Sequence, residues 1–285
     1  MELVDIGVNL GHRSFGGDRD AVLLRARAAG VSTLIITGTN LESSRAAVAL
    51  ARAGQPDLYA TCGVHPHDAA RADAHTLAEL TALCAAPEVV AIGECGLDYN
   101  RDFSPRPLQQ RWLGLQIELA LVRQLPLFLH ERDAHAEFVR ILDSYATGGR
   151  LAVPAVVHCF TGDATALYAY LERGFYIGIT GWICDERRGG ELQRLAARIP
   201  LDRLLIETDA PFLLPRNLPA AARGGRAGRG RNEPALLPHI ARTLAECMGQ
   251  PVETIAAATT RNARALFRLD ASRGLPSEKG RAPGT

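Results

Sequence analysis

The sequence predicts a (β/α)8 barrel, in which eight parallel strands close into a ring and helices cover the outside. Short apolar runs alternate with amphipathic stretches rich in Ala, Leu and Arg along almost the whole chain. Strands that alternate with helices form right-handed βαβ units with a parallel sheet. Eight such units close a barrel. A doubly wound open sheet is the alternative, because the number of strands is difficult to count from one sequence.

The predicted elements follow one another at the spacing of one strand and one helix. Each predicted strand is a short apolar run, and each predicted helix is a longer amphipathic stretch. Strands are expected at residues 3–8, 33–38, 58–64, 89–92, 126–130, 155–160, 175–179 and 203–207. Helices are expected at residues 18–29, 42–53, 76–85, 106–124, 134–145, 164–173, 189–199 and 233–248.

The last predicted helix and the end of the chain carry signals of their own. Asn232 is a suitable N-cap and Pro234 fits the first turn, so the last helix is expected to begin there. Residues 270–285 are rich in Gly, Pro, Ser and charge, which predicts a disordered tail. The expected organisation is one barrel domain over residues 1–269, followed by this tail.

Charge and lysine content exclude several functions. The chain has 285 residues and a net charge of +1, so no overall field attracts nucleic acid or a membrane, and any basic surface is local. Its single lysine is Lys279, in the predicted tail. A Schiff-base lysine, a P-loop lysine or a carboxylated lysine between two metals is therefore not expected. The sequence also lacks GxSxG, Walker A and HExxH motifs and a GxGxxG after a strand.

Three features bear on location. No run of about 18 apolar residues is present, so no transmembrane helix is expected. The first ten residues include Glu2 and Asp5 and no basic group, which does not fit a signal peptide. The six cysteines form no CxxC pair, so free buried thiols are expected. We predict a cytoplasmic protein with no membrane or protein partner.

Polar residues gather where the predicted strands end, which is the active-site end of this kind of barrel. Glu94, His130, His158 and Asp209 occupy this position in four different strand–helix units. Two imidazoles and two carboxylates form a site for Zn²⁺ or Mn²⁺ or, with water, Mg²⁺. The alternative is that each residue only caps its own strand, but four convergent residues favour a metal site.

Further polar residues lie at the same rim. His65 and His67 flank Pro66, and either can contact a phosphate or protonate a leaving group, or it can bond only to solvent. Arg132, two residues past His130, points to the same side and suits a phosphate, unless it pairs with Asp133.

Some neighbours allow two interpretations. Asp98 can support a ligand or cap the following loop. Cys95 and Cys159 directly follow Glu94 and His158, so strand alternation should turn both thiols toward the helices. Trp182 and Asp185 can line a substrate groove, or they can be a packed tryptophan and a turn aspartate.

An arginine-rich segment follows the last predicted strand. It leaves the barrel just after Asp209, and Arg223, Arg226 and Arg229 lie among glycines. We predict that these three arginines bind substrate phosphates, with a solvated insertion as the alternative.

Several blocks resemble the signature blocks of the TatD family of deoxyribonucleases, and the resemblance runs from Val4 to about Leu269. The blocks that carry it are Gly63-Val64-His65-Pro66-His67, Gly93-Glu94-Cys95-Gly96-Leu97-Asp98, Val157-His158-Cys159-Phe160-Thr161-Gly162 and Glu207-Thr208-Asp209-Ala210-Pro211. The family implies a barrel, a divalent metal and hydrolysis of DNA phosphodiesters. Its founding member is described as a magnesium-dependent 3′→5′ exonuclease linked to DNA repair.

The resemblance implies a set of roles. Glu94, His130 and His158 match the metal ligands, and Asp209 matches the catalytic or ligating aspartate. Most members carry His-x-His at the end of the first strand, where this chain has Gly7 and Asn9. We therefore expect one tightly held ion rather than a full two-metal centre.

The predicted function is that of a metal-dependent deoxyribonuclease, a 3′→5′ exonuclease on single-stranded DNA or frayed ends. Mg²⁺ is the expected ion, with Mn²⁺ or Zn²⁺ as alternatives. Asp209 and His65 are the predicted catalytic residues, acting with a metal-activated water. Arg132, His67 and the three loop arginines are the predicted substrate contacts. The alternatives are an amidohydrolase-type barrel that cleaves another ester or an amide, and a non-catalytic nucleic-acid-binding protein.

Overall fold

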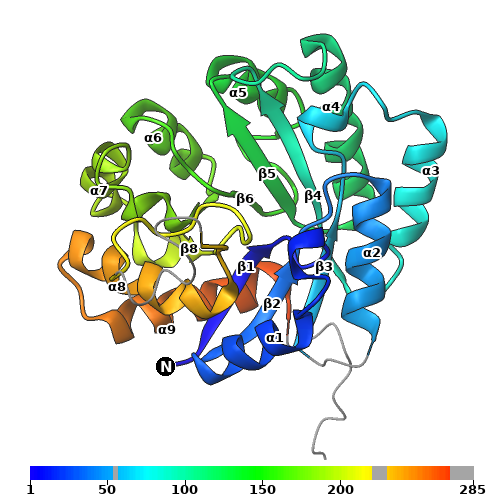
Figure 1. Ribbon diagram of the computed structural model, residues 1–285. Coiled ribbons are helices and arrows are strands. Elements are labelled where there is room, and N and C mark those ends of the chain that lie inside the picture. The colour runs from blue at the N-terminus through cyan, green and yellow to red at the C-terminus, as the bar shows by residue number, and fades with distance from the viewer. Residues whose placement is uncertain (54–56, 220–229, 270–285) are drawn as a thin grey trace, which may run out of the picture.

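A computed structural model describes residues 1–53, 57–219 and 230–269. Its single sheet has eight strands, and each strand pairs in parallel with the next along the chain. The strands are β1 (Leu3–Val8), β2 (Val31–Ile36), β3 (Leu58–Cys62), β4 (Val89–Asp98), β5 (Leu127–Arg132), β6 (Ala155–Val157), β7 (Tyr176–Ile179) and β8 (Leu204–Ile206). The predicted (β/α)8 barrel is thereby confirmed (Figure 1).

The ring closes between β1 and the residues that follow β8. The Asp209 amide donates to the Gly7 carbonyl, and the Asn9 amide donates to the Ala210 carbonyl, both at 2.8 Å. Below them, the buried Asp5 carboxylate accepts the Thr208 amide at 2.9 Å. Burial raises the pKa of Asp5 to about 7 despite its hydrogen bonds from Thr208. These contacts hold Asp209 in place at the seam of the barrel.

The helices surround the ring of strands (Figure 1). They are α1 (Arg19–Ala28), α2 (Leu41–Arg52), α3 (Ala74–Leu83), α4 (Arg106–Arg123), α5 (His135–Ser144), α6 (Ala164–Glu172), α7 (Gly190–Ala196), α8 (Leu237–Met248) and α9 (Val252–Phe267). Short 3-10 helices lie at Arg13–Phe15, Pro66–Asp68, Gly181–Cys184, Leu201–Arg203 and Pro234–Leu236. In the described part of the chain, no helix is both long and apolar enough to cross a bilayer.

The apolar core has two parts. The larger part lies between the strands and the surrounding helices. The smaller part fills the barrel, where residues such as Ile6, Phe128 and Leu205 meet Leu266 and Phe267 from the end of α9. Tyr59, near the start of β3, donates its hydroxyl to the Leu269 carbonyl at 2.8 Å. The end of α9 therefore plugs the N-terminal end of the barrel and leaves the opposite end for chemistry.

Two details of the prediction need correction. The last helix expected from the sequence ends at residue 248, and α9 was not predicted, because a ninth helix has no place in a pattern of eight repeats. Asn232 is not a helix N-cap: α8 begins at Leu237, after the 3-10 turn that starts at Pro234. The Asn232 side-chain amide instead donates to the carbonyls of Thr208 and Phe212. The predicted tail at residues 270–285 lies outside the described residues.

Candidate metal centre

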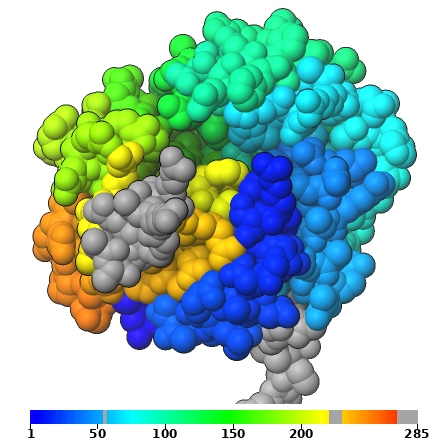
Figure 2. Space-filling model, viewed as in Figure 1, coloured from blue at the N-terminus to red at the C-terminus, as the bar shows by residue number. Residues whose placement is uncertain are grey.

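A pocket of about 670 Å³ lies at the carboxyl ends of the strands. Figure 2 shows the surface hollowed between the blue N-terminal residues and the green middle of the chain. Several strands deliver polar residues to this pocket, each at or just beyond the strand's end. These residues are Asn9 after β1, His65 after β3, Glu94 and Asp98 in β4, His130 and Arg132 in β5, His158 after β6 and Asp209 after β8.

A hollow of about 770 Å³ lies near the opposite end, between Met1, Glu2 and α9. Its lining has charged residues, such as Glu253 and Arg261, but neither histidine nor aspartate. Of these two hollows, only the strand-end pocket brings imidazole and carboxylate groups together. We therefore place the chemistry there.

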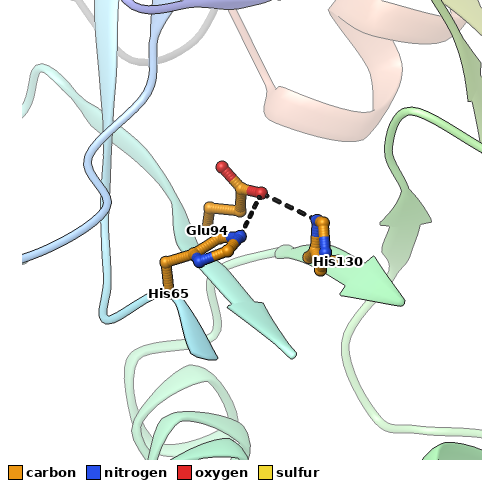
Figure 3. Close-up of side chains that lie close together, drawn as sticks. All are labelled: His65, Glu94 and His130. Atoms are coloured by element: carbon orange, nitrogen blue, oxygen red, sulfur yellow. Dashed lines mark ion pairs between the residues drawn. The ribbon is translucent and has the colours of Figure 1, made fainter. Parts of the chain in front are cut away.

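Glu94 is the centre of the strand-end pocket. Its Oε1 lies 3.2 Å from His65 Nε2, 3.0 Å from His130 Nδ1 and 2.7 Å from His158 Nε2. Figure 3 shows the carboxylate between the rings of His65 and His130. The structure thus brings together three of the four predicted ligands, Glu94, His130 and His158, and adds His65 to them.

The protonation of this cluster follows from its charges. Burial alone would raise the pKa of Glu94, but the adjacent imidazoles hold it well below its usual range. Burial opposes charge on His158, yet Glu94 and Glu207 raise its pKa well above normal. Burial lowers the pKa of His65 to about 4, although Glu94 partly offsets this effect. Glu94 is therefore an anion, and His65 is neutral at pH 7.

The donor atoms fit a cation. Ligand atoms of His65, Glu94 and His130 all lie within 4.8 Å of one another, and the two predicted ligands among them, Glu94 and His130, are close enough to share one ion. His130 Nε2 is buried and has no hydrogen-bond partner among the described residues, since Asp98 Oδ2 is 3.6 Å away. A mixed set of nitrogen and carboxylate donors suits Zn²⁺ or Mn²⁺, and also Mg²⁺ where water completes the shell.

Hydrogen bonds assign different roles to His65 and His158. His65 Nδ1 accepts the His67 amide at 3.1 Å, so the proton of the neutral ring is on Nε2. His65 is then a donor, which opposes its use as a metal ligand in this conformation. His158 Nδ1 faces Glu207 Oε2 at 3.4 Å, which favours a proton on Nδ1. Because the pKa of His158 is raised, Nε2 also carries a proton, which a metal bound at Nε2 would displace.

Asp98 and His67 form a second pair beside this cluster. Their Oδ2 and Nε2 atoms are 2.7 Å apart. Burial tends to raise the pKa of Asp98, but interactions with His130, His67 and the Arg101 amide lower it far more. Asp98 also accepts the backbone amides of Asn100 and Arg101. Asp98 therefore caps the loop, while its support of a metal ligand stays a prediction, since His130 Nε2 is 3.6 Å away.

Asp209 lines the pocket on the side opposite β4. Its Oδ1 accepts the Asn9 side-chain amide at 2.9 Å. Burial raises the pKa of Asp209 to about 7, with His158 opposing the shift and Glu94 adding to it. Asn9 thus orients Asp209 in this structure.

Glu207 explains the glycine at position 7. Its fully buried carboxylate accepts the Cys159 amide at 2.6 Å and faces His158. A Cβ atom added to Gly7 would lie 2.2 Å from Glu207 Oε2. The carboxylate therefore occupies the space that a side chain at residue 7 needs. This role was not predicted; its signal in the chain is a second carboxylate at the end of the last predicted strand, two residues before Asp209.

The other predicted contacts differ in outcome. Arg132 lines the pocket with its guanidinium 5.8 Å from the Trp182 ring, while Asp133 accepts a hydrogen bond from Asn100. Trp182 also lines the pocket, whereas Asp185 is buried in a turn and binds Arg188.

Cys95 is buried in the outer core as predicted, but Cys159 lines the pocket. The prediction for Cys159 was wrong because β6 ends at Val157 and Cys159 has φ +46°, so strand alternation no longer applies. Arg223, Arg226 and Arg229 lie outside the described residues.

Imidazoles and carboxylates at the strand ends of an eight-stranded barrel define the class of metal-dependent barrel hydrolases. A family model described as TatD related DNase matches residues 4–268. The chain belongs to this family.

Relatives and solved structures agree with this assignment. The chain is 49% identical over 268 residues to "3'-5' ssDNA/RNA exonuclease TatD" of Citrobacter rodentium, covering 94% of this chain and 98% of that relative. It is 47% identical to the protein of the same name from Salmonella typhimurium, over 94% of this chain and 99% of that relative. The crystal structure of YJJV, a TatD homologue from Escherichia coli k12, superposes with a TM-score of 0.83 at 30% identity, covering 93% of this chain and 98% of that one.

Proposed function

We propose that this protein removes nucleotides from the 3′ end of single-stranded DNA by metal-dependent hydrolysis. The observation that carries the proposal is the convergence of three imidazoles on Glu94 in an open pocket, in a chain of the TatD related DNase family. The 3′→5′ direction and the single-stranded substrate rest on the names of relatives that are nearly half identical over almost their whole length.

Glu94, His130 and His158 are the residues that would hold a divalent cation, and Asp209 is within the same pocket to complete the set. We propose Mg²⁺ as the ion used, with Mn²⁺ or Zn²⁺ as substitutes. A divalent cation supplies positive charge that polarises a phosphoryl oxygen and an attacking water. Since Gly7 offers no donor atom, we propose one tightly held ion.

The protein's own groups have separate tasks. Asp209, oriented by Asn9, accepts a proton from the attacking water. His65 is neutral with its proton on Nε2, so it can donate a hydrogen bond to a phosphate oxygen or to the leaving oxygen. Arg132 offsets phosphate charge from the β5 side of the pocket, and His67 lines the same wall.

Two finer assignments complete the proposal. Contacts of Arg223, Arg226 and Arg229 with more distant phosphates stay a prediction, because these residues lie outside the described part of the chain. We propose the cytoplasm as the compartment, because all six cysteines are free thiols.

The test uses one single-stranded oligonucleotide labelled at either end, incubated with Mg²⁺, Mn²⁺ or Zn²⁺. We expect 5′-labelled DNA to shorten stepwise and 3′-labelled DNA to release a labelled mononucleotide at once. An oligonucleotide with a blocked 3′ end should resist. Absence of DNA cleavage with every metal, together with hydrolysis of an amide or lactone panel, would overturn the proposal.

A further inference from the structure

Two exposed phenylalanines stand at the mouth of the metal pocket. Phe103 is 65% exposed and Phe212 is 50% exposed, and both line the pocket. Large apolar side chains are otherwise rarely exposed in the described residues; the others are Met1, Leu24, Val122 and Tyr168. Since exposed aromatic rings are costly in water, two of them on one polar pocket indicate a ligand with flat apolar surfaces.

The two rings lie on opposite walls. Phe103 is in the loop between β4 and α4, whereas Phe212 follows β8. In a ring of eight strands ordered β1 to β8, β4 and β8 are four strands apart, which places their carboxyl ends across the mouth from each other. Glu94 and its histidines lie in the same pocket between these walls.

Hydrogen bonds connect the main chain near both phenylalanines to residues of the pocket. Asp98 accepts the amides of Asn100 and Arg101, which fixes the start of the loop that carries Phe103. The Phe212 amide donates to the Asp209 carbonyl at 3.0 Å, and the Phe212 carbonyl accepts from the Asn232 side chain at 2.6 Å. The positions of the two rings are therefore set relative to the catalytic groups before any ligand arrives.

Each ring also rests on an imidazole. The Phe103 ring centroid is 4.7 Å from that of His67, and the Phe212 ring centroid is 5.4 Å from that of His12 in an edge-to-face arrangement. Much of each side chain stays exposed beside these contacts. An exposed ring held against a neighbouring group is suited to stacking.

We propose that Phe103 and Phe212 are two base-stacking platforms that hold the nucleobases on either side of the scissile phosphate. This inference rests on the proposed function, because it takes single-stranded DNA as the substrate. Every base offers a flat π-face, and a phenyl ring has no hydrogen-bonding group, so stacking would place the strand without selecting its sequence. A paired duplex does not present free base faces, so the platforms also explain a preference for single strands.

The experiment compares Phe103→Ala, Phe212→Ala and the double variant with wild type. The substrates are an oligonucleotide and a version with abasic sites at its two 3′-terminal positions. We expect each substitution to lower kcat/KM on normal DNA by about 5- to 150-fold, the range for losing one stacked base. On abasic DNA the wild type should fall to the level of the double variant, and the variants should lose nothing further. Phe103→Trp and Phe212→Trp should keep activity.

Tyr168→Ala is the matched control, because Tyr168 is an aromatic residue 45% exposed on α6 and away from the pocket lining. Its kcat/KM should match wild type on both substrates. If the phenylalanine variants lose the same factor on abasic and normal DNA, the rings act by packing on His67 and His12 and the proposal is wrong. It is equally wrong if the variants behave like Tyr168→Ala.

A binding measurement separates this inference from the proposed function. It uses an oligonucleotide with 2-aminopurine at the 3′ end and a non-hydrolysable terminal linkage, with Mg²⁺ present. We expect wild type to quench the fluorescence and the double variant to leave it unchanged. Quenching without any cleavage of normal DNA would contradict the proposed exonuclease and support the stacking. Cleavage with equal quenching by wild type and double variant would contradict the stacking alone.

Discussion

Glu94 is the residue through which the three histidines of the pocket are coupled. Replacing it with glutamine removes the negative charge but keeps the size of the side chain, so the imidazoles lose their shared counter-ion. We expect Glu94→Gln to abolish high-affinity binding of Mn²⁺ in a calorimetric titration and to abolish DNA cleavage. Circular dichroism should stay that of wild type. Normal metal affinity in this variant would remove Glu94 from the ligand set.

Glu207 faces the His158 ring and should therefore affect the metal affinity of the same site. A carboxylate behind a ligating imidazole fixes its tautomer, and losing such a partner typically costs 10–100-fold in metal affinity. Glu207→Gln keeps an oxygen for the Cys159 amide, so we expect metal affinity to fall by about that factor while the fold stays intact. Glu172→Gln, an exposed change at the end of α6, is the control. Equal affinities in the two variants would assign Glu207 a packing role only.

A substitution at Gly7 tests how firmly the Glu207 carboxylate is held in its position. A methyl group at residue 7 meets the Glu207 carboxylate, whereas one at Gly11 meets nothing closer than 3.9 Å. We expect Gly7→Ala to lower the free energy of unfolding by about 1–3 kcal/mol, the usual cost of overpacking, and to weaken metal binding. Gly11→Ala should do neither. If urea titrations give the same unfolding free energy for both variants, Glu207 can leave its position without cost.

At this scale, the sequence located the polar residues of the strand-end pocket but not the groups that support them. Glu94, His130, His158 and Asp209 could be found because the end of a barrel strand is readable from the chain. The pairing of Asp209 with Asn9 joins residues at the two ends of the ring, and no local pattern predicts it. Cys159 could not be oriented correctly, since its positive φ is set by the turn after β6 and not by a strand.

At the level of elements, helices were predicted correctly where the period of the hydrophobic pattern and the length of the amphipathic stretch were clear. Seven of the predicted helices start within two residues of α1 to α7, because their amphipathic stretches are uninterrupted. The start of α8 was placed too early, because Asn232 and Pro234 look like a cap and a first turn. The side chain of Asn232 is used instead to hold the carbonyls of Thr208 and Phe212. Such tertiary use of a capping residue is not visible in sequence.

The segment that enters α8 is fixed to α1 by ion pairs. Arg231 binds both oxygens of Asp18 at 2.7 and 2.8 Å, and Arg25 joins Asp18 to Glu233. The Arg231 hydrogen bonds lower the pKa of Asp18 to about 2, with Arg25 adding to the effect. A folded-state pKa below the unfolded value of about 4 stabilises the fold above pH 4, and this stabilisation is lost as pH falls from 4 toward 2.

We therefore expect Asp18→Asn to lower the Tm at pH 7 by a small amount, because solvent screens these exposed pairs. The Tm difference from wild type should stay constant above pH 5 and shrink as pH falls from 4 toward 2, as measured by differential scanning fluorimetry. Asp20→Asn, an exposed acid in the first turn of the same helix, is the control. A Tm difference that stays constant with pH would show that Asp18 acts without its charge.

For the whole molecule, a bound metal ion should raise the free energy of unfolding. An ion that binds only the folded chain adds about 2.7 kcal/mol at a free concentration one hundred times its Kd, which for a chain of this size is a rise of about 5–10 °C in Tm. We expect Mn²⁺ to raise the Tm of wild type and EDTA to reverse the rise. Glu94→Gln should show no metal-dependent change. A rise of equal size in Glu94→Gln would place the stabilising ion elsewhere.

The plug formed by α9 has a consequence for how the molecule can be handled. Glu2 accepts a hydrogen bond from Thr260 of α9, and the described chain reaches Leu269 beside Tyr59, so both of these chain positions are at the closed floor of the barrel (Figure 1). A tether attached before Met1 would then start from the side facing away from the mouth. The protein could be immobilised on a bead or a single-molecule surface with its pocket directed outward. A long strand could enter and shorten unobstructed while the enzyme stays anchored.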